Sequence, residues 1–235
     1  MSAATPPRGA PLSRETVVTA AIAMVDQYGL SALSMRQLGR LLGVEAMALY
    51  HHVNGREDLL EAMVADLVES IRVPPRDPLG PADGWQAFLQ HVAHAIRAIA
   101  VDHPQLFPLV ATRPPAAPWL RPPLRNLALV EDFLDGLLHR GLSEDNAVWV
   151  YKAFTGFLLG HLLLEVVQAG APAGPPEEPL DEGDADVPND DQQVDLDDFP
   201  TLLRLKSRLR RHDADVDFED ALEALLDRLD LELSQ

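Results

Sequence analysis

The 235-residue sequence contains no cysteine, so it has no disulfide framework and is compatible with the reducing cytoplasm. Residues 1–12 are rich in proline and alanine and lack the apolar stretch of a signal peptide. No run of the sequence approaches the ~20 apolar residues of a membrane span. We therefore expect a soluble, cytoplasmic protein that does not cross a membrane.

The sequence also lacks the short motifs of common enzyme classes. It has no His-Glu-x-x-His metal motif, no nucleophile elbow and no phosphate-binding P-loop. His161 and Glu165 form an i, i+4 pair, but two residues alone are weak support for a metal site. We therefore predict that the protein is not an enzyme and uses no metal or cofactor.

Basic residues are scarce, because 19 Lys and Arg stand against 37 Asp and Glu, for a net charge of -18. Such a charge argues against nucleic-acid binding, which depends on contacts with phosphates. The acidic excess lies after residue 60, however, because the arginines and carboxylates before it balance. Residues 171–198 are acidic without Lys or Arg, which predicts a flexible, solvated acidic loop.

Apolar residues recur at helical spacing along the chain, which predicts an all-α fold. Residues 1–12 are expected to form a disordered arm, whose Arg8, together with Arg14 just beyond it, either reaches DNA or is simply solvated. Residues 13–72 are expected to form a three-helix domain with a connecting helix. Residues 73–235 are expected to form a larger helical bundle.

A helix-turn-helix is predicted within the first of these domains. Ser34 and Gln37 have the spacing of a capping box, so a helix starts near Met35. Gly43 supplies the permissive backbone at a sharp turn, and a second short helix follows at about residues 45–52. Two helices joined in this way form a unit that places the second helix in the DNA major groove.

The stretch from Gly43 to Leu60 reads G-V-E-A-M-A-L-Y-H-H-V-N-G-R-E-D-L-L and resembles the TetR family of bacterial transcriptional regulators. The family pattern is a glycine-hydrophobic turn, then L-Y-x-H-[VF], a basic residue and L-L. Further on, W-Q-A-F-L, A-T-R-P, G-L-S-E-D-N-A and F-T-G-F-L-L-G-H-L-L-L-E resemble the ligand-binding domain of the tetracycline repressors. The resemblance implies a homodimeric repressor that a small molecule releases from a palindromic operator.

Register with the family implies a set of DNA-binding residues. Arg36 is placed to contact a base edge or a phosphate, and Ala46 and Met47 can touch only thymine methyl groups or exclude the wrong base. Tyr50, His51 and Arg56 are implied to contact phosphates, although Tyr50 is read equally well as core packing. The predicted set is Arg36, Ala46, Met47, Tyr50, His51 and Arg56.

Mg²⁺-tetracycline does not match the predicted bundle of residues 73–235 as an effector. The resemblance puts Val92, Leu109 and Leu164 where the family has an asparagine, a histidine and a glutamate, and leucine and valine cannot hold a hard cation. Glu165 is one residue, or ~100°, out of place. We expect an apolar or amphipathic organic effector, although ordinary core packing is the commoner role of such residues. The candidate lining is Trp85, Phe88, Val92, Ile96, Leu109, Thr112, Arg113, Phe133, Phe154, Phe157 and Leu158.

Two helices, at residues 143–168 and 218–233, are implied by the resemblance to pair with their copies in a homodimer. Gly156 and Gly160 lie one turn apart in the first of these, where they allow either close helix approach or space for a ligand. Residues 199–211 predict a basic, amphipathic helix. An alternative from the net charge is an acidic helical adaptor that binds protein partners rather than DNA.

Overall fold

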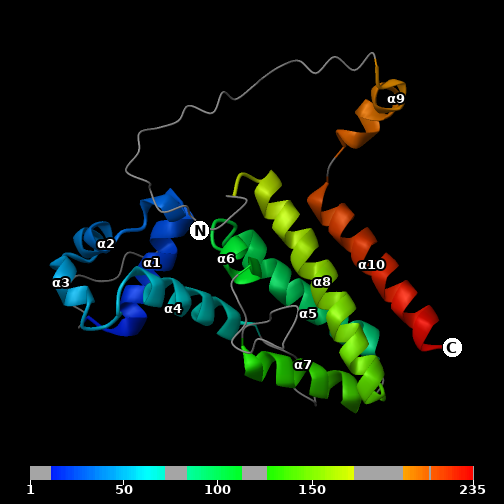
Figure 1. The fold of residues 1–235 in the computed structure, drawn as a ribbon, viewed down its shortest axis with the longest axis horizontal. Coiled ribbons are helices and arrows are strands. Elements are labelled where there is room, and N and C mark those ends of the chain that lie inside the picture. Colours follow the sequence, from blue (N-terminus) through cyan, green and yellow to red (C-terminus); the bar gives the residue numbers. More distant parts are fainter. Residues whose placement is uncertain (1–11, 72–83, 113–125, 172–197, 212, 235) are drawn as a thin grey trace. The chain divides into compact units, whose positions relative to one another are not determined.

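The computed structural model describes residues 12–71, 84–112, 126–171, 198–211 and 213–234, and in these ranges the regular structure is entirely helical (Figure 1). The chain divides into two compact units, which are Met1–Pro176 with Glu232–Gln235, and Glu177–Leu231. The predicted all-α fold is confirmed. The expected arm lies outside the described residues except for Leu12, and the expected acidic loop except for Ala171 and Asp198.

The N-terminal part of the first unit, here called the head, contains four α-helices and a short 3-10 turn. They are α1 (Arg14–Tyr28), η1 (Leu30–Ala32), α2 (Met35–Leu42), α3 (Ala46–Leu49) and α4 (Arg56–Glu69). The Ser13 hydroxyl caps α1 by accepting from the Thr16 N–H at 3.1 Å. Gly29 ends α1 with φ at 80°, a value that favours glycine. Helix α1 is therefore the first of the helices expected in residues 13–72.

The predicted cap of α2 is also found, because the Ser34 hydroxyl accepts from the Gln37 N–H at 3.2 Å. The helix ends at Gly43, whose φ is 71°. The next helix is shorter than the predicted 45–52. The N–H groups of Tyr50, His51 and His52 bond three residues back rather than four, so the last turn tightens and α3 ends at Leu49.

The rest of the first unit, here called the body, holds α5 (Trp85–Asp102), α6 (Phe107–Thr112), α7 (Leu127–His139) and α8 (Glu144–Gln168). The long helix α8 packs against the other three. The Phe133 ring lies at the centre of the bundle, with its centroid 5.6 Å from those of Phe88, Tyr151 and Phe154. This aromatic cluster is buried and fills the space between α5, α7 and α8.

Helix α8 corrects one expectation from the sequence. Within the described residues, its length and composition are those of a helix able to cross a membrane, although no such run was expected. Its most apolar stretch is 44% buried inside the protein, and it contacts α5, α6 and α7. The apolar character of α8 therefore has an explanation in the packing of the bundle.

The second unit contributes α9 (Pro200–Leu209), and α10 (Ala214–Leu233) begins in it. Helix α10 starts four residues before the predicted 218, and it buries Phe218, Leu222, Leu226 and Leu229. Their spacing of three or four residues puts them on one face of the helix. None of the residues of α9 is buried, so both the basic and the apolar side chains of this helix are at least partly exposed.

Candidate nucleic-acid interface

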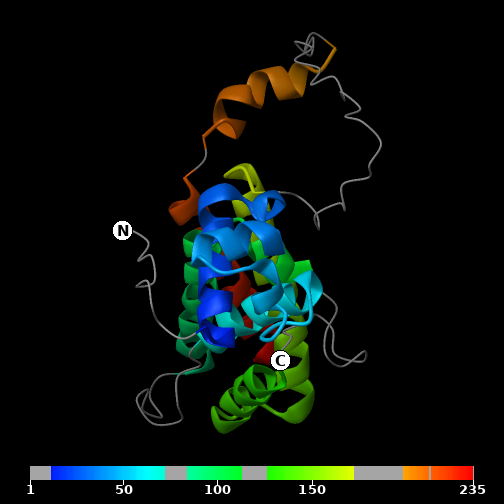
Figure 2. The same cartoon turned by 90° about the vertical axis from the view of Figure 1, so that its left-hand side faces the viewer.

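The turn between α2 and α3 depends on Gly39, which is buried near the middle of α2. A Cβ atom at this position would lie 2.9 Å from the Val44 carbonyl oxygen and 3.3 Å from Ala46 Cα. The Gly39 carbonyl in turn accepts from the Val44 N–H at 2.9 Å. The two helices therefore meet backbone to backbone, side by side at the tip of the head (Figure 2). Sequence reasoning assigned the turn to Gly43 and missed Gly39.

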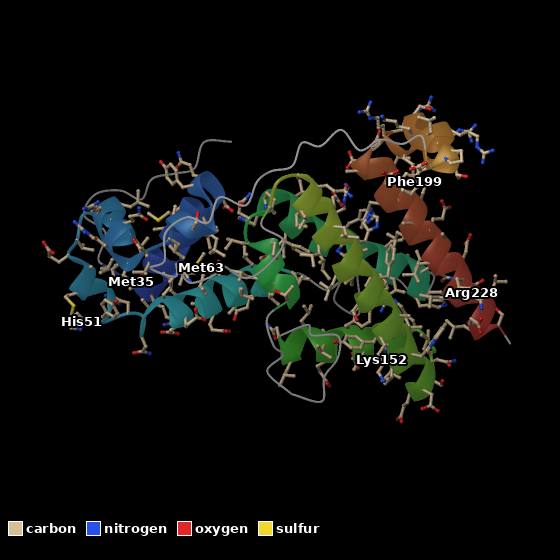
Figure 3. All side chains as sticks on the ribbon, turned by 45° about the horizontal axis from the view of Figure 1, so that its top comes forward. Met35, His51, Met63, Lys152, Phe199 and Arg228 are labelled. Atoms are coloured by element: carbon tan, nitrogen blue, oxygen red, sulfur yellow. The ribbon has the colours of Figure 1, made fainter. Side chains whose placement is uncertain are left out.

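Helix α3 is held by one side and open on the other. Leu49 is fully buried, whereas Met47 is 72% exposed and Ala46 is half-buried. Tyr50, just after the helix, is 46% exposed and is therefore not a core residue. His51 is exposed at the outer edge of the head (Figure 3).

Exposed arginines lie on α2, the helix that packs against α3. Arg36 and Arg40 are both exposed and lie one turn apart on α2, so they share a face of that helix. Arg56 is less free, because its Nε donates to the Leu33 carbonyl at 3.4 Å and its Nη1 lies 4.0 Å from Glu57. A third of its side chain is still exposed. A phosphate contact by Arg56 stays a prediction.

Asp58 connects the start of α4 to the start of α1. The Arg14 guanidinium donates to both carboxylate oxygens, at 2.8 and 3.1 Å, and also to the His52 carbonyl at 2.9 Å. The Asn54 N–H donates to the same carboxylate at 2.7 Å. These bonds lower the pKa of Asp58 to about 2, and the hydrogen bond from Arg14 has the largest effect. Arg14 is thus part of the folded head, where its guanidinium bonds to Asp58 and His52.

The head meets the body through His103, which ends α5. Its Nδ1 lies 2.8 Å from the Asp26 carboxylate of α1. The hydrogen bond with Asp26 raises the pKa of His103, and the charges of Asp26, Asp102 and Asp66 act in the same direction. Helix α4 also contacts α6. Both helices that flank the turn region of the head therefore contact the body.

The predicted effector residues are mostly in the core of the body. Trp85 and Phe157 are half-buried, and Thr112 is exposed with its hydroxyl donating to the Pro108 carbonyl at 2.7 Å. Arg113 lies outside the described residues. The remaining members are all buried, namely Phe88, Val92, Ile96, Leu109, Phe133, Phe154 and Leu158. The structure brings Phe88, Phe133 and Phe154 together, and it leaves their role in binding a prediction.

The residues present do not fit the Mg²⁺ site that the resemblance to the tetracycline repressors implies. Val92 and Leu109 are buried hydrocarbon, and Leu164 is 64% exposed. Glu165 is engaged by Arg97, with an Nη2–Oε1 distance of 2.9 Å and both side chains 13% exposed. In the described ranges, no group of three His, Asp or Glu side chains is arranged to hold a metal ion.

Two family descriptions match the chain. "Bacterial regulatory proteins, tetR family" matches residues 17–63, and "Tetracyclin repressor-like, C-terminal domain" matches residues 77–232. An HTH-type transcriptional regulator of Saccharopolyspora erythraea is 28% identical over 156 residues, which are 66% of this chain and 62% of that regulator. The chain thus spans less than two thirds of that relative's length.

Two further comparisons agree with this result. The class D tetracycline repressor protein of Escherichia coli is 29% identical over 174 residues, or 71% of this chain and 74% of that one. The crystal structure of the Streptomyces coelicolor protein ActR in complex with actinorhodin has a TM-score of 0.68 and 24% identity. The match covers 96% of this chain and 100% of that one, and at this identity it shows the fold.

Proposed function

Since the chain belongs to the tetR family of bacterial regulatory proteins, we propose that it is a homodimeric repressor released from a palindromic operator by a small organic effector. The observation that carries the proposal is the open face of α3, together with the exposed arginines of α2, the helix that packs against it. The relatives are transcriptional regulators, so neither an enzyme nor an acidic adaptor is favoured. A cytoplasmic location accords with this function.

The net charge of -18 does not conflict with DNA binding. Phosphate contacts need positive charge only where the protein meets the duplex. Arg36 and Arg40 supply it beside α3, and Tyr50 and His51 add hydrogen-bonding groups. The acidic excess lies after residue 60, mostly in residues 177–235, and it repels the duplex there, which favours binding through the head. Phosphate contacts make the affinity fall steeply with salt.

An apolar or amphipathic effector accords with the chemistry of the body. Val92, Leu109 and Leu164 stand where the resemblance places the metal ligands, and their side chains are hydrocarbon. The carboxylate of Glu165, next to Leu164 in the sequence, is already bonded to Arg97. A hard cation needs several oxygen ligands. We expect Mg²⁺-tetracycline at micromolar concentration to leave the thermal unfolding midpoint unchanged. A rise of several degrees would contradict this part of the proposal.

The homodimer is proposed to form through α8 and α10. Trp149, Gly156, Gly160 and Leu164 lie at helical spacing along α8 and are all exposed. A Cβ atom on Gly160 would meet nothing within 4 Å, so a second copy has room to approach this stripe closely. Replacement by a bulky residue, Gly160→Leu, is expected to weaken dimerisation in sedimentation equilibrium. An unchanged dimer would show that the interface lies elsewhere.

DNA binding is tested by fluorescence anisotropy with duplexes from the intergenic DNA beside the gene, over a salt series. We expect nanomolar affinity, as is typical of specific regulators, and a steep loss with salt. Tyr50→Ala is expected to weaken binding about tenfold or more, in the range of a lost phosphate or base contact. Arg56→Ala is expected to weaken it as well.

The matched control is Tyr28→Ala. Tyr28 is 59% exposed and ends α1, two residues after the Asp26 that bonds to the body, so it lies away from α3. It should leave DNA binding unchanged. Salt-insensitive binding, or equal losses in both tyrosine variants, would contradict a specific interface at α3. Absence of any specific binding at low salt would favour the adaptor alternative.

A further inference from the structure

Helix α3 presents very little hydrogen-bonding chemistry to its surroundings. Its four residues are Ala46, Met47, Ala48 and Leu49. The methionine sulfur is only a weak acceptor, and the other three side chains have no polar atom. Met47 is also the most exposed of the large hydrophobic residues in the described parts of the chain, at 72%.

The packing of α3 fixes the direction in which Met47 points. Leu49 is fully buried, and a residue two positions before it lies ~200° around the helix, on the opposite side. The close contact of Gly39 with Val44 and Ala46 prevents α3 from rotating to hide Met47. The alanines on either side are short, so they do not hold a partner surface away from it.

We propose that Met47 determines operator sequence by contacting the C5-methyl group of a thymine in the major groove. The inference rests on the proposed function, because it concerns the same interface. Among the base edges in that groove, the thymine methyl is the apolar one, and the others present donors or acceptors. A methionine that covered a donor or acceptor would leave it desolvated and unpaired. Each half-site therefore has an A·T pair at the Met47 position.

The thioether also suits this contact physically. Methionine has an unbranched chain with three rotatable bonds and a polarizable sulfur, so it adapts to the position of a methyl group. Polar readout falls to the neighbours of α3, since Arg36, Tyr50 and His51 have hydrogen-bonding groups and are exposed. The arrangement predicts one apolar position in each half-site, flanked by positions that are read through polar contacts.

The test begins with a duplex that the wild-type protein selects from a random-sequence pool. Each thymine of one half-site is then replaced by deoxyuridine, which removes only the methyl group, and affinity is measured by anisotropy. At one thymine we expect the replacement to weaken wild-type binding roughly fourfold, the effect of one buried methyl group. The same replacement should have no effect on Met47→Ala, and it should keep most of its effect on Met47→Leu.

Met47→Gln provides a second measurement, because glutamine has a similar length and pairs with adenine. We expect this variant to select adenine in place of the contacted thymine. Melting temperatures of all variants should match the wild type, since Met47 packs against little. Equal sensitivity to deoxyuridine in wild type and Met47→Ala at every thymine would overturn the inference alone. Failure to select any duplex would overturn the proposed function and the inference with it.

Discussion

Head and body each depend on a glycine at which two elements approach closely, and the obstacle that a side chain would meet differs. At Gly39 in the head, a Cβ atom would lie 2.9 Å from the Val44 backbone. At Gly136 in the body, a Cβ atom would lie 2.5 Å from the Phe88 ring. The head is therefore fixed by its main chain, and the body by packed rings.

Their ion pairs differ in the same way. The Arg14–Asp58 pair of the head is partly exposed, with side-chain exposures of 49% and 26%. The Arg97–Glu165 pair of the body is 13% exposed on both sides. Exposed pairs stabilise little but can set geometry, whereas a buried carboxylate and its partner depend strongly on each other. The Arg14–Asp58 pair therefore mainly sets the geometry of the head, whereas the Arg97–Glu165 pair contributes mainly to the stability of the body.

The largest effects are expected from filling the two glycines. Gly39→Val and Gly136→Val should each destabilise the protein by about 1–3 kcal/mol, as overpacking does. Gly39→Val should abolish DNA binding even below its melting temperature, because α3 is displaced. Gly136→Val should retain DNA binding below its own melting temperature. Thermal unfolding and anisotropy measure both, and equal loss of DNA binding in the two variants would contradict the comparison.

A smaller effect is expected at the buried ion pair. Glu165→Gln removes the charge that Arg97 bonds, and we expect a loss of about 1–2 kcal/mol in urea unfolding. Replacement of both residues, Arg97→Met with Glu165→Leu, should recover most of it, since a hydrophobic pair of similar volume is tolerated. A double variant that is less stable than Glu165→Gln would argue that the pair has a role beyond mutual neutralisation.

At the exposed pair, Asp58→Asn should cost no more than about 1 kcal/mol through the lost charge-assisted bonds to Arg14 and Asn54, because solvent screens them. The folded pKa of Asp58 is lowered, so its contribution is present above the unfolded value near 4 and is lost as the pH falls toward about 2. The stability difference between wild type and variant should therefore shrink over this acidic range. A difference independent of pH would assign the effect to packing.

The smallest effect is expected at the joint of head and body. The folded pKa of His103 is raised, so the stabilisation is complete below the unfolded value near 6.5 and is lost as the pH rises through the folded pKa. His103→Leu should lower stability by no more than about 1 kcal/mol, and only on the acidic side. Asp26→Asn should show the same pH dependence, and a gap that persists at pH 9 would contradict it.

Local sequence rules predicted the helices well where caps and glycines mark their ends. The Ser34 hydroxyl accepts the Gln37 N–H of the predicted capping box, and Gly43 ends α2 at the predicted turn with positive φ. The end of α3 was predicted three residues too late, because no glycine or proline marks it in the Leu-Tyr-His-His run, where the backbone changes to i–3 bonds. Gly39 was missed for a related reason, since a helical glycine shows its use only through what lies opposite.

The candidate interface was predictable in its residues and not in their contacts. The exposure of Met47, Tyr50 and His51 accords with the burial of Leu49, which holds α3 by its other side. The pairing of Arg14 with Asp58, 44 residues apart, has no local signal. The same holds for Arg97 and Glu165, at a separation of 68. Such long-range pairs depend on how the helices pack.

The bonds of Asp58 have a mechanical consequence for the proposed regulator. Hydrogen bonds join the start of α1, the segment after α3 and the start of α4 into one rigid unit. They run from Arg14 to Asp58 and to the His52 carbonyl, and from the Asn54 N–H to Asp58. A displacement of α4 is therefore passed on to α3 without deformation of the head. An effector that shifts α6 against α4 would therefore move α3 as a rigid body. The proposed dimer would then release the operator because its two heads no longer align with the DNA, while each head stays folded.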